Sequence, residues 1–201
     1  VERPKGINWV SPALRKVGGR TELLFQSRLG LTAYDPGNGN KIWTHTTESS
    51  TIPTPVLMDD LVLMMGRGLV AIRPKGELAE VVWSSAKLSS GSCTPLVYQD
   101  HVYSVTGAGV LVCTDKNGKE TWPEGERLKK GKYWAWPIAG DGKIYVFNGE
   151  GICTVVRAGG EMPEVLATND IKEEIMGTPA IADGAIYIQT VSGVWCISNK
   201  K

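Results

Sequence analysis

The stretch that decides the fold of this 201-residue chain is Ala33-Tyr34-Asp35-Pro36-Gly37-Asn38-Gly39-Asn40-Lys41-Ile42-Trp43. The Asp, Pro, Gly and Asn residues at its centre favour a tight turn, since Pro presets one turn angle and Gly and Asn tolerate the others. An alternating strand is predicted before the turn, and Trp43 ends a second strand after it. A version one residue shorter runs from Asp115 through Gly118 to Trp122. The same hairpin therefore occurs twice in one chain.

A repeat of about 40 residues extends outward from these hairpins, and a period of that length is typical of propellers and solenoids. Each copy opens with a residue pair that ends in proline, and the pairs are spaced 40 to 43 residues apart: Ser11-Pro12, Thr54-Pro55, Thr94-Pro95, Trp136-Pro137 and Thr178-Pro179. A short first strand is predicted after each proline. Second strands are predicted at residues 60–64, 101–105, 143–147 and 185–189.

A tight turn follows each second strand and ends in a glycine, which accepts the positive φ angle that hairpin turns demand. These glycines are Gly30, Gly68, Gly109, Gly151 and Gly193. Third strands are predicted at residues 31–34, 69–72 and 194–197, and fourth strands end in Trp43, Trp83 and Trp122. Four antiparallel strands make up a propeller blade, so we predict an all-β propeller with five four-stranded blades.

We place these blades in a single domain over residues 1–201, with approximate bounds of 7–46, 50–86, 91–125, 133–168 and 175–198. No fourth strand is predicted after the third strand of the last repeat. Propellers close their ring by borrowing a strand from the other terminus, which protects an exposed edge. We therefore expect an upstream segment to supply that strand together with further blades, in a propeller of about eight. A ring of five blades that closes by itself is the alternative.

The hairpin at residues 33–43 resembles the A-x-D-x-x-T-G-K-x-x-W tryptophan-docking motif of PQQ-like, or quinoprotein-type, propeller repeats. Asn38 and Asn40 stand where the motif has Thr and Lys. In that family the indole packs against the backbone of the neighbouring blade, which adds aromatic area between two sheets. The resemblance therefore implies structural docking roles for Ala33, Asp35, Gly39, Trp43, Trp83, Asp115, Gly118 and Trp122.

The balance of charges argues against a general attraction to nucleic acid, because 22 Lys and Arg residues oppose 21 Asp and Glu residues and the net charge is +1. No stretch approaches the roughly 18 apolar residues that a membrane span needs. The cysteines are spaced too widely for a zinc or dithiol motif. We expect all four in the core, and a disulfide between neighbouring strands stays open: Cys93, Cys113, Cys153 and Cys196.

No catalytic residue, metal ligand or cofactor is predicted. The sequence contains no G-x-S-x-G elbow, H-E-x-x-H pair or phosphate-binding loop, and His45 and His101 lack ligand spacing. Quinoprotein dehydrogenases have PQQ-like blades but use adjacent cysteines and a carboxylate-bound Ca²⁺ beside the quinone. We can match neither feature to residues of this sequence. Upstream blades could hold them, so a fragment of a PQQ-dependent dehydrogenase stays an alternative.

The predicted binding site lies in the connection at residues 123–136, the longest link between two predicted blades. In this fold the links between blades, and the turns between second and third strands, lie on one face, where binding usually occurs. Aromatic and basic side chains gather in and near this link, and the candidate residues are Lys132, Tyr133, Trp134, Trp136, Arg28 and Arg67. Two other interpretations stay open: the charges only solvate a loop, or Trp134 packs inside.

The resemblance implies a non-catalytic binding or assembly scaffold of the bacterial cell envelope, in the periplasm, at the outer membrane or secreted. The assembly-factor lipoprotein of the outer-membrane β-barrel machinery has this repeat type. We expect a protein, small-molecule or glycan partner, and leave open a lipid anchor or an upstream fusion. An extracellular sensor propeller attached to a receptor kinase is the remaining alternative.

Overall fold

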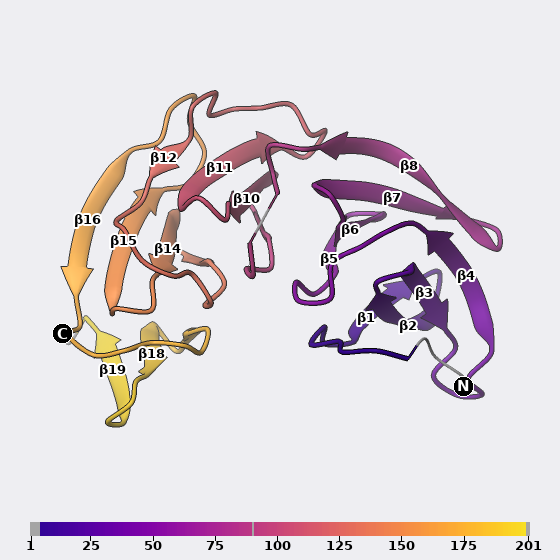
Figure 1. Ribbon diagram of the computed structural model, residues 1–201, viewed down its shortest axis with the longest axis horizontal. Helices are drawn as coiled ribbons and strands as arrows, with labels where there is room; N and C mark the ends of the chain where they lie inside the picture. Colours follow the sequence, from indigo (N-terminus) through magenta and orange to yellow (C-terminus); the bar gives the residue numbers. More distant parts are fainter. Residues whose placement is uncertain (1–4, 90, 200–201) are drawn as a thin grey trace. The chain divides into compact units, whose positions relative to one another are not determined.

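The computed structural model describes residues 5–89 and 91–199, which form β-strands, turns and irregular segments and contain no helix (Figure 1). No helix that could cross a membrane is therefore found in these two ranges. The chain divides into two compact units, Val1–Ser90 and Gly91–Lys201. The assignment of blades within one single domain stays a prediction.

The first unit is one eight-stranded sheet built from two antiparallel groups of four strands. Its strands are β1 (Ala13–Val17), β2 (Arg20–Ser27), β3 (Gly30–Tyr34), β4 (Lys41–Thr46), β5 (Val56–Met58), β6 (Leu61–Met65), β7 (Leu69–Lys75) and β8 (Leu78–Ser85). Within each group a strand pairs with the next one along the chain. The last strands of the two groups, β4 and β8, are joined by one parallel pair between Thr44 and Leu78.

The second unit contains three antiparallel sheets, again with each strand paired to the next along the chain. Their strands are β9 (Leu96–Tyr98), β10 (His101–Val105), β11 (Val110–Asp115) and β12 (Glu126–Arg127), then β13 (Ile138–Gly140), β14 (Lys143–Phe147), β15 (Ile152–Arg157) and β16 (Val165–Asp170), then β17 (Ala180–Ala182), β18 (Ala185–Gln189) and β19 (Val194–Ser198). Strand β13 lies beside both β9 and β17, so the first strands of the three sheets are neighbours.

The predicted positions of the first, second and third strands are confirmed. Each first strand begins directly after the proline of its repeat, at Ala13, Val56, Leu96, Ile138 and Ala180. Strands β10, β14 and β18 coincide with the predicted second strands, and β6 is shifted by one residue. Proline presets φ and cannot donate to a ladder, so it suits the position just before a strand.

The fourth strands differ from the prediction, because β4 and β8 continue past their tryptophans to Thr46 and Ser85, and the third one does not include its tryptophan. Trp43 and Trp83 lie within β4 and β8, but Trp122 lies in a bend before the two-residue strand β12. Pro123 directly follows Trp122 and cannot donate a hydrogen bond to the neighbouring strand. Pairing with β11 therefore resumes only after Gly125, which has a φ angle of +65°.

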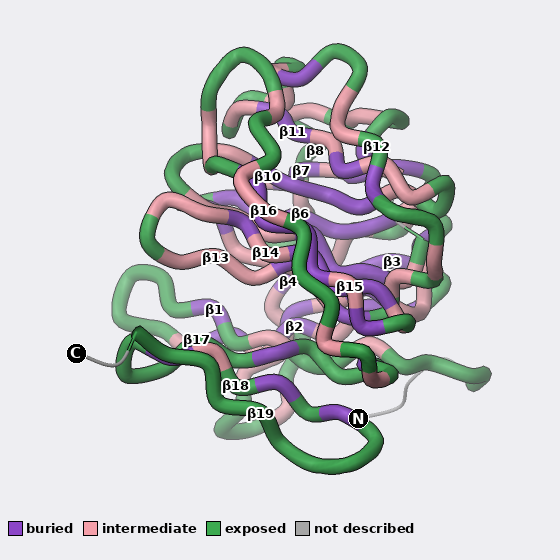
Figure 2. The backbone as a smooth tube through the Cα atoms, turned by 90° about the vertical axis from the view of Figure 1, so that its left-hand side faces the viewer, coloured by how far each residue is buried: buried purple, intermediate pink, exposed green. Residues whose placement is uncertain are grey.

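Apolar side chains are buried between neighbouring groups of strands. In the first unit Leu24 and Trp43 pack with Val62 and Met64 of the next group. In the second unit one cluster joins β10 and β11 to β14 and β15, and another surrounds Phe147. Burial runs along β6 and β10, whereas β19 is exposed over its whole length (Figure 2). These clusters hold neighbouring groups of strands together within each unit, because they remove apolar surface from water.

All four cysteines are free, so the disulfide that the sequence left open does not form. Cys93, Cys113 and Cys153 are buried as expected, and burial raises the pKa of the Cys93 and Cys153 thiols to about 12. The expectation of a buried position is wrong for Cys196, which lies on the exposed edge strand β19.

The turn glycines follow the prediction only in part. Gly30, Gly109 and Gly151 have positive φ angles, whereas Gly68 and Gly193 do not. Gly68 is needed for another reason, the close approach of two backbone segments. A Cβ at Gly68 would lie 2.8 Å from the Cα of Ala86. It would also overlap the carbonyl oxygen of Ser85.

Replacing Gly68 with alanine is expected to lower the free energy of unfolding by about 1–3 kcal/mol, because the added methyl group must push two backbone segments apart. Gly193→Ala is the matched control, since no atom lies within 4 Å of its Cβ position. Its effect is expected to stay within about 0.5 kcal/mol. Urea denaturation measures both changes, and equal midpoints would contradict the close contact at Gly68.

Candidate binding site

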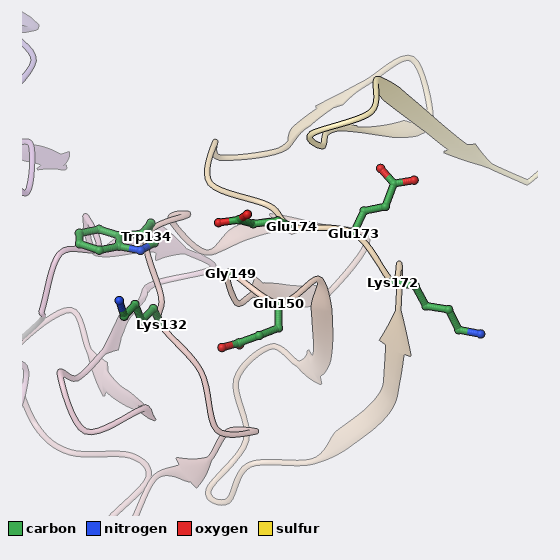
Figure 3. A pocket seen from close by; sticks show the side chains of 7 residues that line it. All are labelled: Lys132, Trp134, Gly149, Glu150, Lys172, Glu173 and Glu174. Atoms are coloured by element: carbon green, nitrogen blue, oxygen red, sulfur yellow. The ribbon is translucent and has the colours of Figure 1, made fainter.

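Three connections of the second unit meet at Trp134 (Figure 3). The β12–β13 link carries Lys132 and Trp134, the β14–β15 turn carries Gly149 and Glu150, and the β16–β17 link carries residues 172–174. Together they line a hollow of about 400 Å³. The sequence predicted that links between groups and turns between second and third strands share a face, and this hollow confirms it for these three connections.

A second hollow, of about 290 Å³, is also lined by Lys132 and Trp134. Its other lining residues are small or neutral: Gly91, Ser92, Val105, Thr106, Gly107, Gly131 and Tyr133. Trp134 is 43% exposed, so the interpretation that it packs inside is wrong. Because one accessible indole lines both hollows, a partner that contacts the ring can extend into either of them.

Hydrogen bonds along the β12–β13 link hold Trp134 in place. The carbonyl oxygen of Lys132 accepts from an amide of the β14–β15 turn at 2.7 Å, and Cys93 Sγ donates to the carbonyl oxygen of Tyr133 at 3.1 Å. The Tyr133 hydroxyl donates to the carbonyl oxygen of Lys129 at 2.6 Å. Burial is the main cause that raises the pKa of Tyr133 to about 12, so this donor keeps its proton at neutral pH. The backbone next to Trp134 is therefore held by several hydrogen bonds.

Glu173 is engaged by the neighbouring β18–β19 turn. Its carboxylate accepts a hydrogen bond from the Ser192 hydroxyl. This bond is the main cause that holds the pKa of Glu173 below its usual value. Glu173 therefore points away from Trp134, as Figure 3 shows.

The other charged side chains of the first hollow differ in direction (Figure 3). Lys172 also points away from Trp134. Glu150 and Glu174 extend towards the side on which Trp134 and Lys132 lie. Among the lining residues, the charges on the side of the hollow where Trp134 lies are thus one ammonium and two carboxylates.

The predicted site residues of the second unit do not all lie together. Lys132, Tyr133 and Trp134 line the hollows, whereas Trp136 lines neither. Trp136 is half-buried, and its backbone amide donates to Thr178 Oγ1 at 3.0 Å. This hydrogen bond therefore joins the segment just before β13 to the segment just before β17.

The two predicted arginines lie in the first unit and are both exposed. Arg28 lies in the β2–β3 turn, where its carbonyl oxygen accepts from the Ser49 amide at 3.2 Å. Arg67 pairs with Glu48 at 3.2 Å and lines a separate hollow of about 400 Å³. Neither arginine is among the residues that line the two hollows at Trp134, and a role for them stays a prediction.

The docking-motif residues build two hairpin turns that share the same aspartate contact. Oδ1 of Asp35 and Oδ1 of Asp115 each accept from the amide two residues further on, at 2.7 and 2.8 Å. Gly39 and Gly118 close the turns with φ angles of +75° and +80°. Ala33 precedes the first turn and is fully buried on β3. The turn itself therefore explains why the motif has Asp and Gly at these positions.

The three tryptophans of the motif have different surroundings. Trp43 is buried, and its Nε1 donates to Glu22 on β2 at 2.9 Å. Trp122 is buried, and its Nε1 donates to the carbonyl oxygen of Gly160 at 3.2 Å. Gly160 follows β15, so Trp122 connects one sheet of the second unit to the next. Trp83 is half-buried on β8.

Glu150, Glu174 and Gly131 also line the two hollows but were not predicted from the sequence. Glu150 had a signal, because it directly precedes a turn glycine, as Arg67 does in the second repeat. Aligning the repeats at that glycine would have placed Glu150 on the binding face. Glu174 and Gly131 lie in links of irregular length and carry no such signal. No group of three or more His, Cys, Asp or Glu side chains that could hold a metal ion occurs in residues 5–89 and 91–199.

A protein-family model matches residues 27–194, and its description is outer membrane protein assembly factor BamB. The chain belongs to this family. The resemblance to PQQ-like propeller repeats that the hairpin motif indicated is thereby confirmed. None of the curated proteins matches this BamB-family chain in sequence.

Solved structures support the same fold. The crystal structure of BamB from Moraxella catarrhalis is similar with a TM-score of 0.73 and 16% identity, covering 93% of this chain and 57% of that one. The crystal structure of the computationally designed Ika8 protein is similar with a TM-score of 0.64 and 11% identity, covering 92% of this chain and 57% of that one. The BamB-family chain therefore has an all-β, propeller-like fold, and it spans 57% of the length of each of these structures.

Proposed function

We propose that this BamB-family chain is a non-catalytic binding scaffold of the bacterial cell envelope, in the periplasm or at the outer membrane. In this proposal its five groups of strands are blades of a larger propeller, and it recognises a protein through the loops around Trp134. The family description, which names an assembly factor for outer membrane proteins, supports the location and the scaffold role.

The observation that carries the proposal is the exposed indole of Trp134 on a hydrogen-bonded loop between two hollows. Tryptophans in such settings are frequent hot spots of protein interfaces, because a large rigid ring gains much contact area for little loss of conformational freedom. Lys132 and Glu150 beside it supply a charged rim, which favours specificity and the rate of association.

Photo-crosslinking in the living cell tests this function. The protein, expressed in its own bacterium, carries p-benzoylphenylalanine in place of Trp134. We expect ultraviolet light to link it to one protein of outer-membrane assembly. Met162 is the control position, because it is 76% exposed and lies at the opposite end of β15 from the β14–β15 turn. A crosslink from position 162 but none from position 134 would contradict the proposed binding face.

The variant Trp134→Ala should lower recovery of the crosslinked partner by about tenfold or more, the usual effect of truncating a hot spot. For this measurement the protein is purified by a terminal tag and the partner is quantified by mass spectrometry. Equal recovery by wild type and variant would remove Trp134 from the interface.

A further inference from the structure

The hollow at Trp134 has an excess of one negative charge among the side chains directed into it. Glu174 extends towards Trp134, and Glu150 extends to the same side of the hollow, where Lys132 also lies (Figure 3). Lys172 points away, and Glu173 is bound to the β18–β19 turn. A ligand that balances this excess negative charge is therefore positively charged.

The two carboxylates are available to such a ligand. In the described part of the chain neither Glu150 nor Glu174 forms an ion pair within 4.0 Å. Glu150 lies close over Gly131, because a Cβ added at Gly131 would overlap its Oε2. Its backbone amide donates to Oδ1 of Asn148 at 3.1 Å, which fixes the turn that carries it. The lack of a side chain at Gly131 thus leaves room for the Glu150 carboxylate at the rim of the hollow.

We propose that this hollow binds a basic side chain, an arginine or a lysine, of the protein partner. The inference rests on the proposed function, since it names the chemistry of the partner at the same site. A guanidinium stacks on an indole face and is attracted by the negative charge of the ring face. Its N–H groups can at the same time donate charge-assisted hydrogen bonds to carboxylates such as those of Glu150 and Glu174. The planar arginine head fits both demands better than an ammonium does.

Two small probes test the charge requirement on the full chain. N-acetyl-arginine amide carries the guanidinium, and N-acetyl-citrulline amide replaces it with a neutral urea of nearly the same shape. We expect the arginine probe to shift the indole N–H resonance of Trp134 in NMR spectra at millimolar concentration. The citrulline probe is expected to bind at least about fivefold more weakly, because it lacks the charge. Equal shifts by the two probes would overturn the proposal.

Variants of the carboxylates locate the interaction. Glu150→Gln and Glu174→Gln should each weaken binding of the arginine probe by about threefold or more, since each removes one charge-assisted bond. Glu161→Gln is the matched control, because Glu161 is exposed and lies in the turn between β15 and β16, at the other end of β15 from Glu150. It is expected to leave binding unchanged. The proposal fails if the three variants bind the probe alike.

The crosslinking assay separates this inference from the proposed function. The double variant Glu150→Gln with Glu174→Gln is combined with the photoreactive residue at position 134. Loss of the crosslinked partner supports the basic side chain. An undiminished crosslink means that the scaffold function holds and that this inference is wrong. Absence of a crosslink without the double variant contradicts the function, while the probe titration still decides whether the hollow binds a guanidinium.

Discussion

Replacing Glu22 with alanine is expected to lower the free energy of unfolding of the first unit by about 3–5 kcal/mol. Glu22 is fully buried, and its carboxylate accepts from Arg15 at 2.9 Å, from Arg20 at 2.6 Å and from the Trp43 indole at 2.9 Å. Alanine leaves Arg15, whose side chain is 9% exposed, as a buried charge without its carboxylate. Urea denaturation measures the loss, and hydrogen exchange at the β2 amides assigns it to this unit.

Glu80→Ala is the control for the same unit. The Glu80 side chain is 47% exposed and pairs with Lys75 at 3.3 Å. Exposed pairs contribute about 0–1 kcal/mol, so this variant should unfold almost as the wild type does. A Glu22→Ala loss as small as that of Glu80→Ala would contradict the buried network.

The same network makes stability depend on pH. Burial raises the pKa of Glu22, but hydrogen bonds from Trp43, Arg15 and Arg20 together outweigh it and hold the pKa below the ordinary value of 4.5. The folded state therefore binds fewer protons than the unfolded state. The contribution of Glu22 is complete above about pH 4.5 and is lost as the pH falls through the lowered pKa. The Glu22→Gln variant lacks this titrating group. Its free energy of unfolding, measured by urea denaturation, should therefore depend less steeply on pH below about 4.5 than that of the wild type.

Replacing Trp122 with alanine is expected to cost the second unit about 3–5 kcal/mol, as other buried aromatic truncations do. Trp122 is 2% exposed, and its ring centroid lies 5.6 Å from that of Tyr103 in an edge-on contact. The variant opens a cavity between two sheets and removes the hydrogen bond to the carbonyl oxygen of Gly160. Thermal denaturation measures the loss, and Trp122→Phe should fall between wild type and alanine because it keeps most of the packing.

Trp134→Ala is the matched control for Trp122→Ala in the same unit. Trp134 is 43% exposed, so the effect on stability should stay within about 0.5 kcal/mol. The two tryptophans are then distinguished by their roles: Trp122→Ala destabilises the second unit, whereas Trp134→Ala is expected only to weaken binding. Equal losses of stability would show that Trp134 supports the fold.

Much of the strand pattern could be predicted from the sequence. The prolines placed the first strands, because proline acts on its own backbone and on its neighbours. The alternation in residues 101–105, 143–147 and 185–189 matched three second strands, because one face of each strand is buried. The prediction failed after Trp122, where Pro123 delays pairing with β11, and at Cys196, where the edge strand leaves the side chain exposed.

The candidate site could be predicted only where its residues are close in sequence. Lys132, Tyr133 and Trp134 lie in one link and were found as a group. Glu174 belongs to a link about 40 residues away, and it lines the same hollow as Trp134 because sheets of the second unit pack side by side. No local sequence pattern predicts that the two links come together, because their meeting depends on their lengths and on how the sheets pack.

The sequence by itself determined where strands and turns begin, because proline, glycine and apolar alternation act on the backbone within a few residues. Only the tertiary structure decided which tryptophan is buried and which is exposed, although Trp122 and Trp134 lie close in sequence, on either side of β12. Burial depends on which surface of a neighbouring sheet covers a side chain, and that surface comes from residues far away along the chain. Packing between sheets therefore made Trp122 part of the core and left Trp134 exposed.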